Sequence, residues 1–278
     1  MKKILAIIVI IIIVVLLGWL FVSDMSQPSQ PVSLSSQPAA STTPPVGSTV
    51  TVAGVRVKIG APFSIPATAT GTTPIGTGQA WGTYTDAAAG FSFDYPSGIM
   101  DAYTKAVDIK SIKSYLPINP AATLVLTLPP SQYPASTTVH QAAIVVAATT
   151  TPTFADCISA ANAISQGVVT SGISVPTTTP TQISIVPPGA APSSGPVNFY
   201  KFPDIYGGCW AGGCAFGTLV ASYQHNTCYQ FGLQAAVTDP GVYATSQQAF
   251  QKMNQINQRF ETQLTTLFYQ ILSTVQFQ

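Results

Sequence analysis

Hydrophobic residues form one unbroken run near the start of the chain and alternate with polar residues over much of the rest. The first run, Ile4 to Val22, contains no charged residue. As a helix it would extend about 28 Å at ~1.5 Å per residue, which matches the hydrocarbon thickness of a bilayer. Lys2 and Lys3 precede the run, and positive charge stays on the cytoplasmic side of a membrane. The pattern predicts a transmembrane signal anchor over residues 1–22, with the N-terminus inside and the remaining chain outside.

A cleaved signal peptide is the alternative for this segment. Its apolar core would be about 7 to 15 residues long, and a cleavage site of small residues would follow. The run here is longer, and no Ala-x-Ala-like site follows at the right distance. We therefore prefer an uncleaved anchor, which predicts a single-pass protein of the cell membrane with an extracytoplasmic C-terminal part.

The anchor is followed by a segment without a hydrophobic pattern. Residues 23–48 are rich in Ser, Pro and Gln, and such a segment buries too little surface to offset the entropy of ordering, so we predict a disordered stalk. Alternation from Thr49 to Ile59 predicts a strand pair with its turn at Ala53-Gly54. Because residues 60–80 return to Pro, Gly and Thr, we interpret 49–80 as an appended strand pair with a linker, and 81–278 as the main domain.

Within residues 81–278 the pattern switches between strand and helix periods. Two alternating runs between Trp81 and Tyr95 predict a hairpin, and further strands are expected at 107–115, 122–128, 139–149, 197–202, 218–225, 228–237 and 274–277. Residues 154–166 are typical of a short helix, whereas 167–196 and 207–217 are expected to be loops. From 250 to 271 apolar residues recur at three- and four-residue steps, which predicts a long helix, and Thr245 and Gln248 have capping-box spacing at its start.

This order of elements predicts the fold class. We expect an α+β fold in which a mostly antiparallel sheet packs against a long C-terminal helix and a short helix, preceded by one N-terminal transmembrane helix. Charged residues make up only 7% of the chain, and beyond residue 22 eight Lys/Arg (ten minus Lys2 and Lys3) stand against nine Asp/Glu, a net charge of −1. A near-neutral domain has no field for steering nucleic acid, so we expect no such partner.

Four cysteines, Cys157, Cys209, Cys214 and Cys228, follow the predicted anchor. Disulfides persist outside the cytoplasm, and four cysteines allow three pairings. We favour Cys209–Cys214, which would close a Gly-rich loop, and Cys157–Cys228, which would tie the short helix to a strand. A redox pair would prefer C-x-x-C, and a zinc site would need further ligands, whereas the two histidines of the chain are well separated in sequence. We therefore predict structural disulfides and no metal or cofactor.

A catalytic interpretation depends on His225. Ser222 and Asp204 are not far from it in sequence, so an envelope hydrolase that uses His225 with a nearby Ser or Asp is an alternative. No G-x-S-x-G elbow is present, and a glycosidase pair would have to come from nine scattered acids with one glutamate. A surface or strand-end histidine is the preferred interpretation, and we do not expect an enzyme.

Aromatic residues gather just before and inside the Cys209–Cys214 loop. They are Tyr200, Phe202, Tyr206 and Trp210. If exposed, they would form a contact rim for a protein or glycan. Such residues are more often part of a core, and this remains the preferred alternative.

Two segments carry a resemblance to a known family. Gly90 to Pro96 reads GFSFDYP; Asn226 to Tyr229 reads NTCY and is followed by Asp239-Pro240, the long helix and a final ILSTVQF. In this order they resemble the PsbP-like (Mog1/PsbP-type) domains of anchored or exported bacterial proteins, over residues 81–278. The resemblance implies an antiparallel sheet packed against helices, and usually no catalytic site. Photosynthetic relatives assist photosystem assembly, but no motif here supports carrying that role over.

The expected function follows from location and architecture together. We expect a membrane-anchored extracytoplasmic protein whose PsbP-like domain serves as a non-enzymatic binding or scaffold module at the cell envelope. Its partners would be the membrane, through residues 4–22, and an envelope protein or glycan. A structural subunit of a surface assembly is a further alternative.

Overall fold

The computed structural model describes residues 44–61, 78–105, 121–165, 179–185, 197–210 and 213–278, and gives only the backbone for 205–210, 213 and 214. These residues belong to one compact unit, Pro44–Gln278. The predicted anchor, the stalk up to residue 43 and the strand predicted at 107–115 lie outside the described residues. Within the described ranges, no helix has the length and apolar character needed to cross a membrane.

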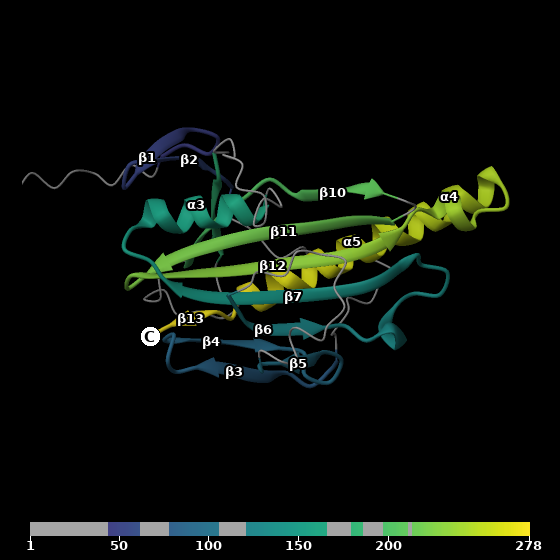
Figure 1. Ribbon diagram of the computed structural model, residues 1–278, viewed down its shortest axis with the longest axis horizontal. Coiled ribbons are helices and arrows are strands. Elements are labelled where there is room, and N and C mark those ends of the chain that lie inside the picture. Colours follow the sequence, from purple (N-terminus) through teal and green to yellow (C-terminus); the bar gives the residue numbers. More distant parts are fainter. Residues whose placement is uncertain (1–43, 62–77, 106–120, 166–178, 186–196, 211–212) are drawn as a thin grey trace, which may run out of the picture. The chain divides into compact units, whose positions relative to one another are not determined.

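The main sheet has ten strands (Figure 1). Its order is β1 (Thr49–Val52), β2 (Val55–Ile59), β8 (Thr181–Ile185), β9 (Val197–Lys201), β11 (Gly213–Gln224), β12 (Thr227–Thr238), β7 (Val139–Thr150), β6 (Ala122–Thr127) and β5 (Asp101–Tyr103), while β10 (Ile205–Trp210) pairs with β11. Every pairing is antiparallel except that of β2 with β8.

A smaller sheet and the helices complete the α+β fold. The small sheet contains β13 (Gln276–Phe277), β4 (Phe91–Tyr95) and β3 (Gly82–Asp86). The helical elements are η1 (Pro130–Gln132), α3 (Phe154–Ser165), α4 (Pro240–Tyr243) and α5 (Gln247–Leu272). The predicted class, a mostly antiparallel sheet with a long C-terminal helix and a short helix, is confirmed for this part of the chain.

Two tight turns define the hairpins of the main sheet. Ala53 (φ 45°) and Gly54 (φ 84°) join β1 to β2, and His225 (φ 49°) and Asn226 (φ 60°) join β11 to β12. Positive φ at both central residues is typical of type I′ turns, whose twist matches that of the flanking strands. The turn predicted at Ala53-Gly54 is therefore present.

The larger hydrophobic core lies between the main sheet, the small sheet and α5. Phe91 and Phe93 of β4 are at most 1% exposed, and Phe91 packs edge-on to Tyr229 with ring centroids 5.3 Å apart. The C-terminal half of α5 contributes Phe260, Leu264, Leu267, Phe268, Ile271 and Leu272. Alternate aromatic residues of the GFSFDYP segment, Phe91 and Phe93, thus face this core, while Ser92 and Asp94 between and after them are only partly buried.

A second core lies on the opposite face of the main sheet, under α3. Successive residues of a strand point to opposite faces, and in β11 Val220 belongs to the larger core while Leu219 and Ala221 belong to the second. Helix α3 covers this face with Phe154, Cys157, Ile158 and Ala161. Short helix and long helix therefore cover different faces of one sheet.

The strand pair expected to be an appendage is part of this main unit. Lys58 of β2 pairs with Thr181 of β8, and Val57 is fully buried in the second core. The boundary drawn at residue 80 thus separates residues that share a sheet and a core. The long sequence gap between β2 and β8 conceals this pairing, because it joins strands that no local turn connects.

Three further expectations need correction. Strand β8 lies within the loop expected at 167–196, and most of β10 and the start of β11 lie within the loop expected at 207–217. Helix α5 is capped by Ser246, whose Oγ accepts a hydrogen bond from the Ala249 N–H at 3.1 Å, and not by Thr245. Because Ala249 stands at the third helical position, this end has a simple N-cap without the reciprocal half of a capping box.

Candidate functional site

The disulfide Cys157–Cys228 joins α3 to β12, as predicted. The Cα atoms are 5.3 Å apart, and the sequence separation of the two cysteines is 71. Both side chains are at most 1% exposed and lie within the second core. Because the bond is buried among apolar side chains, its position is that of a structural brace between helix and sheet.

Polar contacts hold the start of α3 at the same end of the sheet. Thr153 Oγ1 donates to Asp156 Oδ2 at 2.6 Å and accepts from the Asp156 N–H at 3.1 Å. Tyr223 Oη lies 3.1 Å from both Pro152 O and Asn226 Oδ1, next to the β11–β12 turn. Helix start, turn and disulfide therefore form one braced end of the molecule.

The second predicted disulfide, Cys209–Cys214, involves side chains outside the described part of the structure. The backbone places Cys209 on β10 and Cys214 on β11, and these strands pair antiparallel, with Trp210 opposite Gly213. The predicted Gly-rich loop is thus a hairpin. Its disulfide stays a prediction.

The predicted contact rim is divided by the structure. Phe202 is 1% exposed within the second core, and Tyr200 is half-buried with its ring 4.7 Å from that of Phe154. Burial also raises the pKa of Tyr200 above its usual value. Phe202 is therefore a core residue and not part of an exposed rim, whereas the side chains of Tyr206 and Trp210 lie outside the described part of the structure.

The structure does not bring His225 together with the groups proposed as its catalytic partners. His225 is exposed in the β11–β12 turn. Ser222 is 1% exposed and its Oγ donates to Asn198 O at 3.1 Å. Asp204 pairs with Lys201 at 3.1 Å and accepts a hydrogen bond from Thr218 Oγ1. Within the described residues, neither Ser222 nor Asp204 is hydrogen-bonded to His225, so the hydrolase alternative gains no support.

Asp204 is close enough to α5 to influence two of its titratable groups. Burial, and secondarily the charge of Asp204, raise the pKa of Glu261 above its usual value. The same two causes raise the pKa of Tyr269 to about 12. No local sequence pattern indicates this effect, because Asp204 and α5 are far apart in sequence. Within the described residues no group of three or more His, Cys, Asp or Glu side chains is placed to hold a metal ion.

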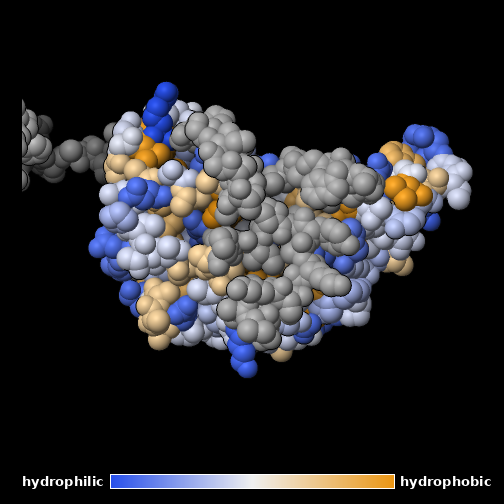
Figure 2. Space-filling model, viewed as in Figure 1, coloured by the Kyte–Doolittle hydropathy of each residue, from blue (hydrophilic) through white to orange (hydrophobic). Residues whose placement is uncertain are grey.

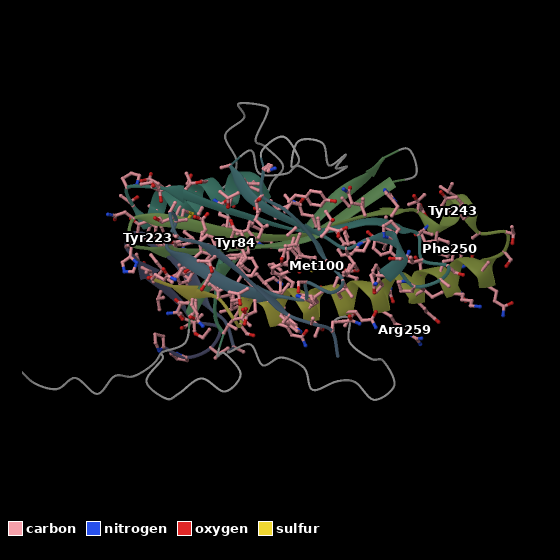
Figure 3. All side chains as sticks on the ribbon, turned by 90° about the horizontal axis from the view of Figure 1, so that it is seen from below. Tyr84, Met100, Tyr223, Tyr243, Phe250 and Arg259 are labelled. Carbon is pink, nitrogen blue, oxygen red and sulfur yellow. A yellow bond between two sulfur atoms is a disulfide. The ribbon has the colours of Figure 1, made fainter. Side chains whose placement is uncertain are left out.

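Exposed apolar side chains mark the junction of α4 and α5. Val242 is 58% and Tyr243 is 61% exposed. The space-filling view shows apolar surface at this end of the molecule (Figure 2), and Figure 3 shows Tyr243 and Phe250 at the same end. Asn257 fixes this part of α5, since its Oδ1 accepts from the Thr138 N–H at 3.0 Å and its Nδ2 donates to Thr138 Oγ1 at 2.8 Å.

Comparisons with known proteins add little to this geometry. No family model matches the chain, and no curated protein matches it. Among solved structures, the chain is similar to the solution structure of cyanobacterial PsbP (CyanoP) from Synechocystis sp. PCC 6803, with 14% identity and a TM-score of 0.36, over 77% of this chain and 98% of that chain. Membership of the PsbP-like family stays a proposal.

Proposed function

We propose that this chain is a single-pass, membrane-anchored extracytoplasmic protein whose folded unit acts as a non-enzymatic binding or scaffold module of PsbP-like type at the cell envelope. Residues 1–22 hold it in the membrane, and the Ser/Pro/Gln-rich segment 23–48 lifts the folded unit from the bilayer. The partner is an envelope protein or glycan.

The observation that carries this proposal is the buried Cys157–Cys228 disulfide. Disulfides form and persist in oxidising compartments and are rare in cytosolic proteins. The uncharged run Ile4 to Val22, preceded by Lys2 and Lys3, supplies a physical route to such a compartment. The disulfide and the apolar run thus independently support an extracytoplasmic location of the folded unit.

The scaffold part of the proposal is supported by how the described polar side chains are used. Asp204 is engaged by Lys201 and Thr218, and Ser222 by a backbone carbonyl. Asn257 is engaged by Thr138. Each of these groups holds one segment of the chain to another, as expected in a rigid module that presents surfaces to a partner.

Protease accessibility tests the topology. Protease added to intact cells that produce the full chain should remove the folded unit and leave a short protected N-terminal remnant that stays with the membrane fraction. Lysed cells serve as the control, since there a cytosolic domain would also be digested. Full protection in intact cells, or recovery of the uncleaved chain in the soluble fraction, would contradict the proposal.

A further inference from the structure

Strand β1 (Thr49–Val52) forms an open edge of the main sheet. Within the described residues it pairs only with β2. Thr49 and Thr51 are exposed, and Val46 just before the strand is 62% exposed. Natural sheets usually block such an edge with a charge, a proline or a bulge, and β1 (TVTV) contains none of these. Within the described residues, this edge therefore carries none of the usual features that would prevent another strand from pairing with it.

The register identifies which backbone groups face the edge. Thr49 lies opposite Lys58 and Thr51 opposite Arg56. The Lys58 N–H donates to Pro180 O at 3.0 Å, so Lys58 directs its backbone groups away from β1. Residues in an antiparallel ladder alternate between pairs that exchange hydrogen bonds and pairs that point outward. The N–H and C=O groups of Thr49 and Thr51 consequently point into the open edge.

We propose that β1 pairs antiparallel with β1 of a second copy of this chain, about a two-fold axis at Val50. Thr49 of one copy then exchanges both backbone hydrogen bonds with Thr51 of the other, and the reverse pair does the same. Every outward N–H and C=O group of Thr49 and Thr51 finds a partner. The edge is self-complementary in this register, so a second copy held in the same membrane can occupy it without any further partner.

The side chains are compatible with this pairing. Val50 and Val52 are half-buried on the sheet face that carries Val57 and the second core, so the paired strands place apolar side chains next to each other. Arg56 and Lys58 are exposed on the opposite face of β2. Three strand spacings, about 14 Å, separate the β2 strands of the two copies, beyond the Debye length of ~8 Å at physiological salt. Repulsion between these cations is therefore screened.

Membrane anchoring explains how an edge of four residues can hold two copies together. This part of the inference rests on the proposed function. A four-residue strand pair is far smaller than a standard interface, so association in dilute solution is weak. Anchoring both copies in one membrane raises their effective concentration. Strand β1 starts directly after the predicted stalk, so the same length of chain separates β1 from the anchor in both copies. The contact is isologous and closes at a dimer, which distinguishes it from a filament contact.

Disulfide trapping of the full chain in liposomes tests the register. Residues at the two-fold axis form a pair without mutual hydrogen bonds, with Cα atoms about 4.5 Å apart, so Val50→Cys should yield a covalent dimer on mild oxidation. Val52→Cys is the matched control, because the two substituted residues would lie about 13 Å apart along the strands. Peptide mass analysis must locate the bond between the two substituted positions.

A second pair of variants tests the hydrogen bonds. In the Val50→Cys background, Thr51→Pro removes an N–H that β2 does not use, and an edge strand tolerates proline there; Thr51→Ala retains that N–H. Trapping should fall at least about tenfold with Thr51→Pro, because each dimer loses two hydrogen bonds, and should persist with Thr51→Ala.

The outcomes separate this proposal from the membrane anchor. Equal trapping of Val50→Cys and Val52→Cys, trapping that survives Thr51→Pro, or a crosslink to another protein in place of a second copy would overturn the pairing. Trapping the same cysteine variants in detergent at high protein concentration tests the β1–β1 pairing in the absence of a membrane. A chain that fails to float with liposomes but still gives the Val50→Cys dimer would refute the anchor and leave the pairing intact.

Discussion

At the scale of single residues, the structure gives His225 a backbone role. Its φ of 49° lies in the left-handed region, which costs most residues other than glycine about 1–2 kcal/mol; His and Asn adopt it at a lower cost, and Asn is the preferred residue at this position of a type I′ turn. His225→Asn should therefore raise the free energy of unfolding by about 0.5 kcal/mol, measured by denaturant titration. His140→Asn, away from the turn, is the control. A loss of stability of 1 kcal/mol or more in His225→Asn would contradict this interpretation.

Glu261 provides a second prediction at this scale, on pH. Burial and the charge of Asp204 raise the folded-state pKa of Glu261, so the native state binds this proton more tightly than the unfolded state does. Stability from this group is present at pH values below its ordinary pKa and is lost as pH rises through the raised folded-state pKa. Glu261→Gln should remove this loss, so that the variant gains stability relative to the native chain at pH 7 and not at pH 4. An equal difference at both pH values would show that Glu261 is not responsible.

At the scale of elements, the disulfide is the covalent attachment of α3 to the sheet. The loop that the bond closes spans 71 residues, and chain entropy assigns such a crosslink about 4 kcal/mol of stability. Cys157→Ala together with Cys228→Ala should lower the free energy of unfolding by about 2–5 kcal/mol and increase hydrogen exchange in α3 more than in α5. Unchanged protection of α3 would mean that its apolar contacts hold it without the bond.

The N-terminal half of α5 depends on Asn257. Removing its side chain leaves the Thr138 N–H without this acceptor, and an unsatisfied buried group costs about 1–3 kcal/mol. Asn257→Ala should lower the free energy of unfolding by roughly that amount, whereas Gln258→Ala on the exposed side should change it by less than about 0.5 kcal/mol. Equal effects of the two substitutions would contradict the importance of this contact.

Comparison of sequence and structure at this scale shows where local patterns suffice. The β3–β4 hairpin, α3 and α5 were predicted because alternation and helical periodicity are visible within each segment. Strand β8 was missed because its five residues, TQISI, lie in a Thr/Pro/Ser-rich stretch and are stabilised by pairing with β2 and β9. The sequence pattern also did not decide whether the Phe202 side chain faces a core or solvent, because that depends on which elements pack against it.

At the scale of the whole molecule, the hydrophobic cores on both faces of one shared sheet belong to one unit, Pro44–Gln278. The pairing of Cys157 with Cys228 was inferred from predicted elements and location, and the structure shows it. The pairing of β2 with β8 could not be inferred, because it joins segments far apart in sequence, and the same holds for the effect of the Asp204 charge on Glu261 and Tyr269. Among the surfaces of the described residues, the β1 edge is the one for which we propose a partner strand and a register.

The central claim is that the membrane run delivers this unit to an oxidising exterior, where the disulfide forms. The direct test is mass analysis of the full chain, alkylated before and after reduction, from the membrane and soluble fractions of the cells that produce it. We predict that the chain is recovered with the membrane and that a Cys157–Cys228 linked peptide is found before reduction. Recovery of the chain in the soluble cytosolic fraction with Cys157 and Cys228 alkylated as free thiols would contradict the account.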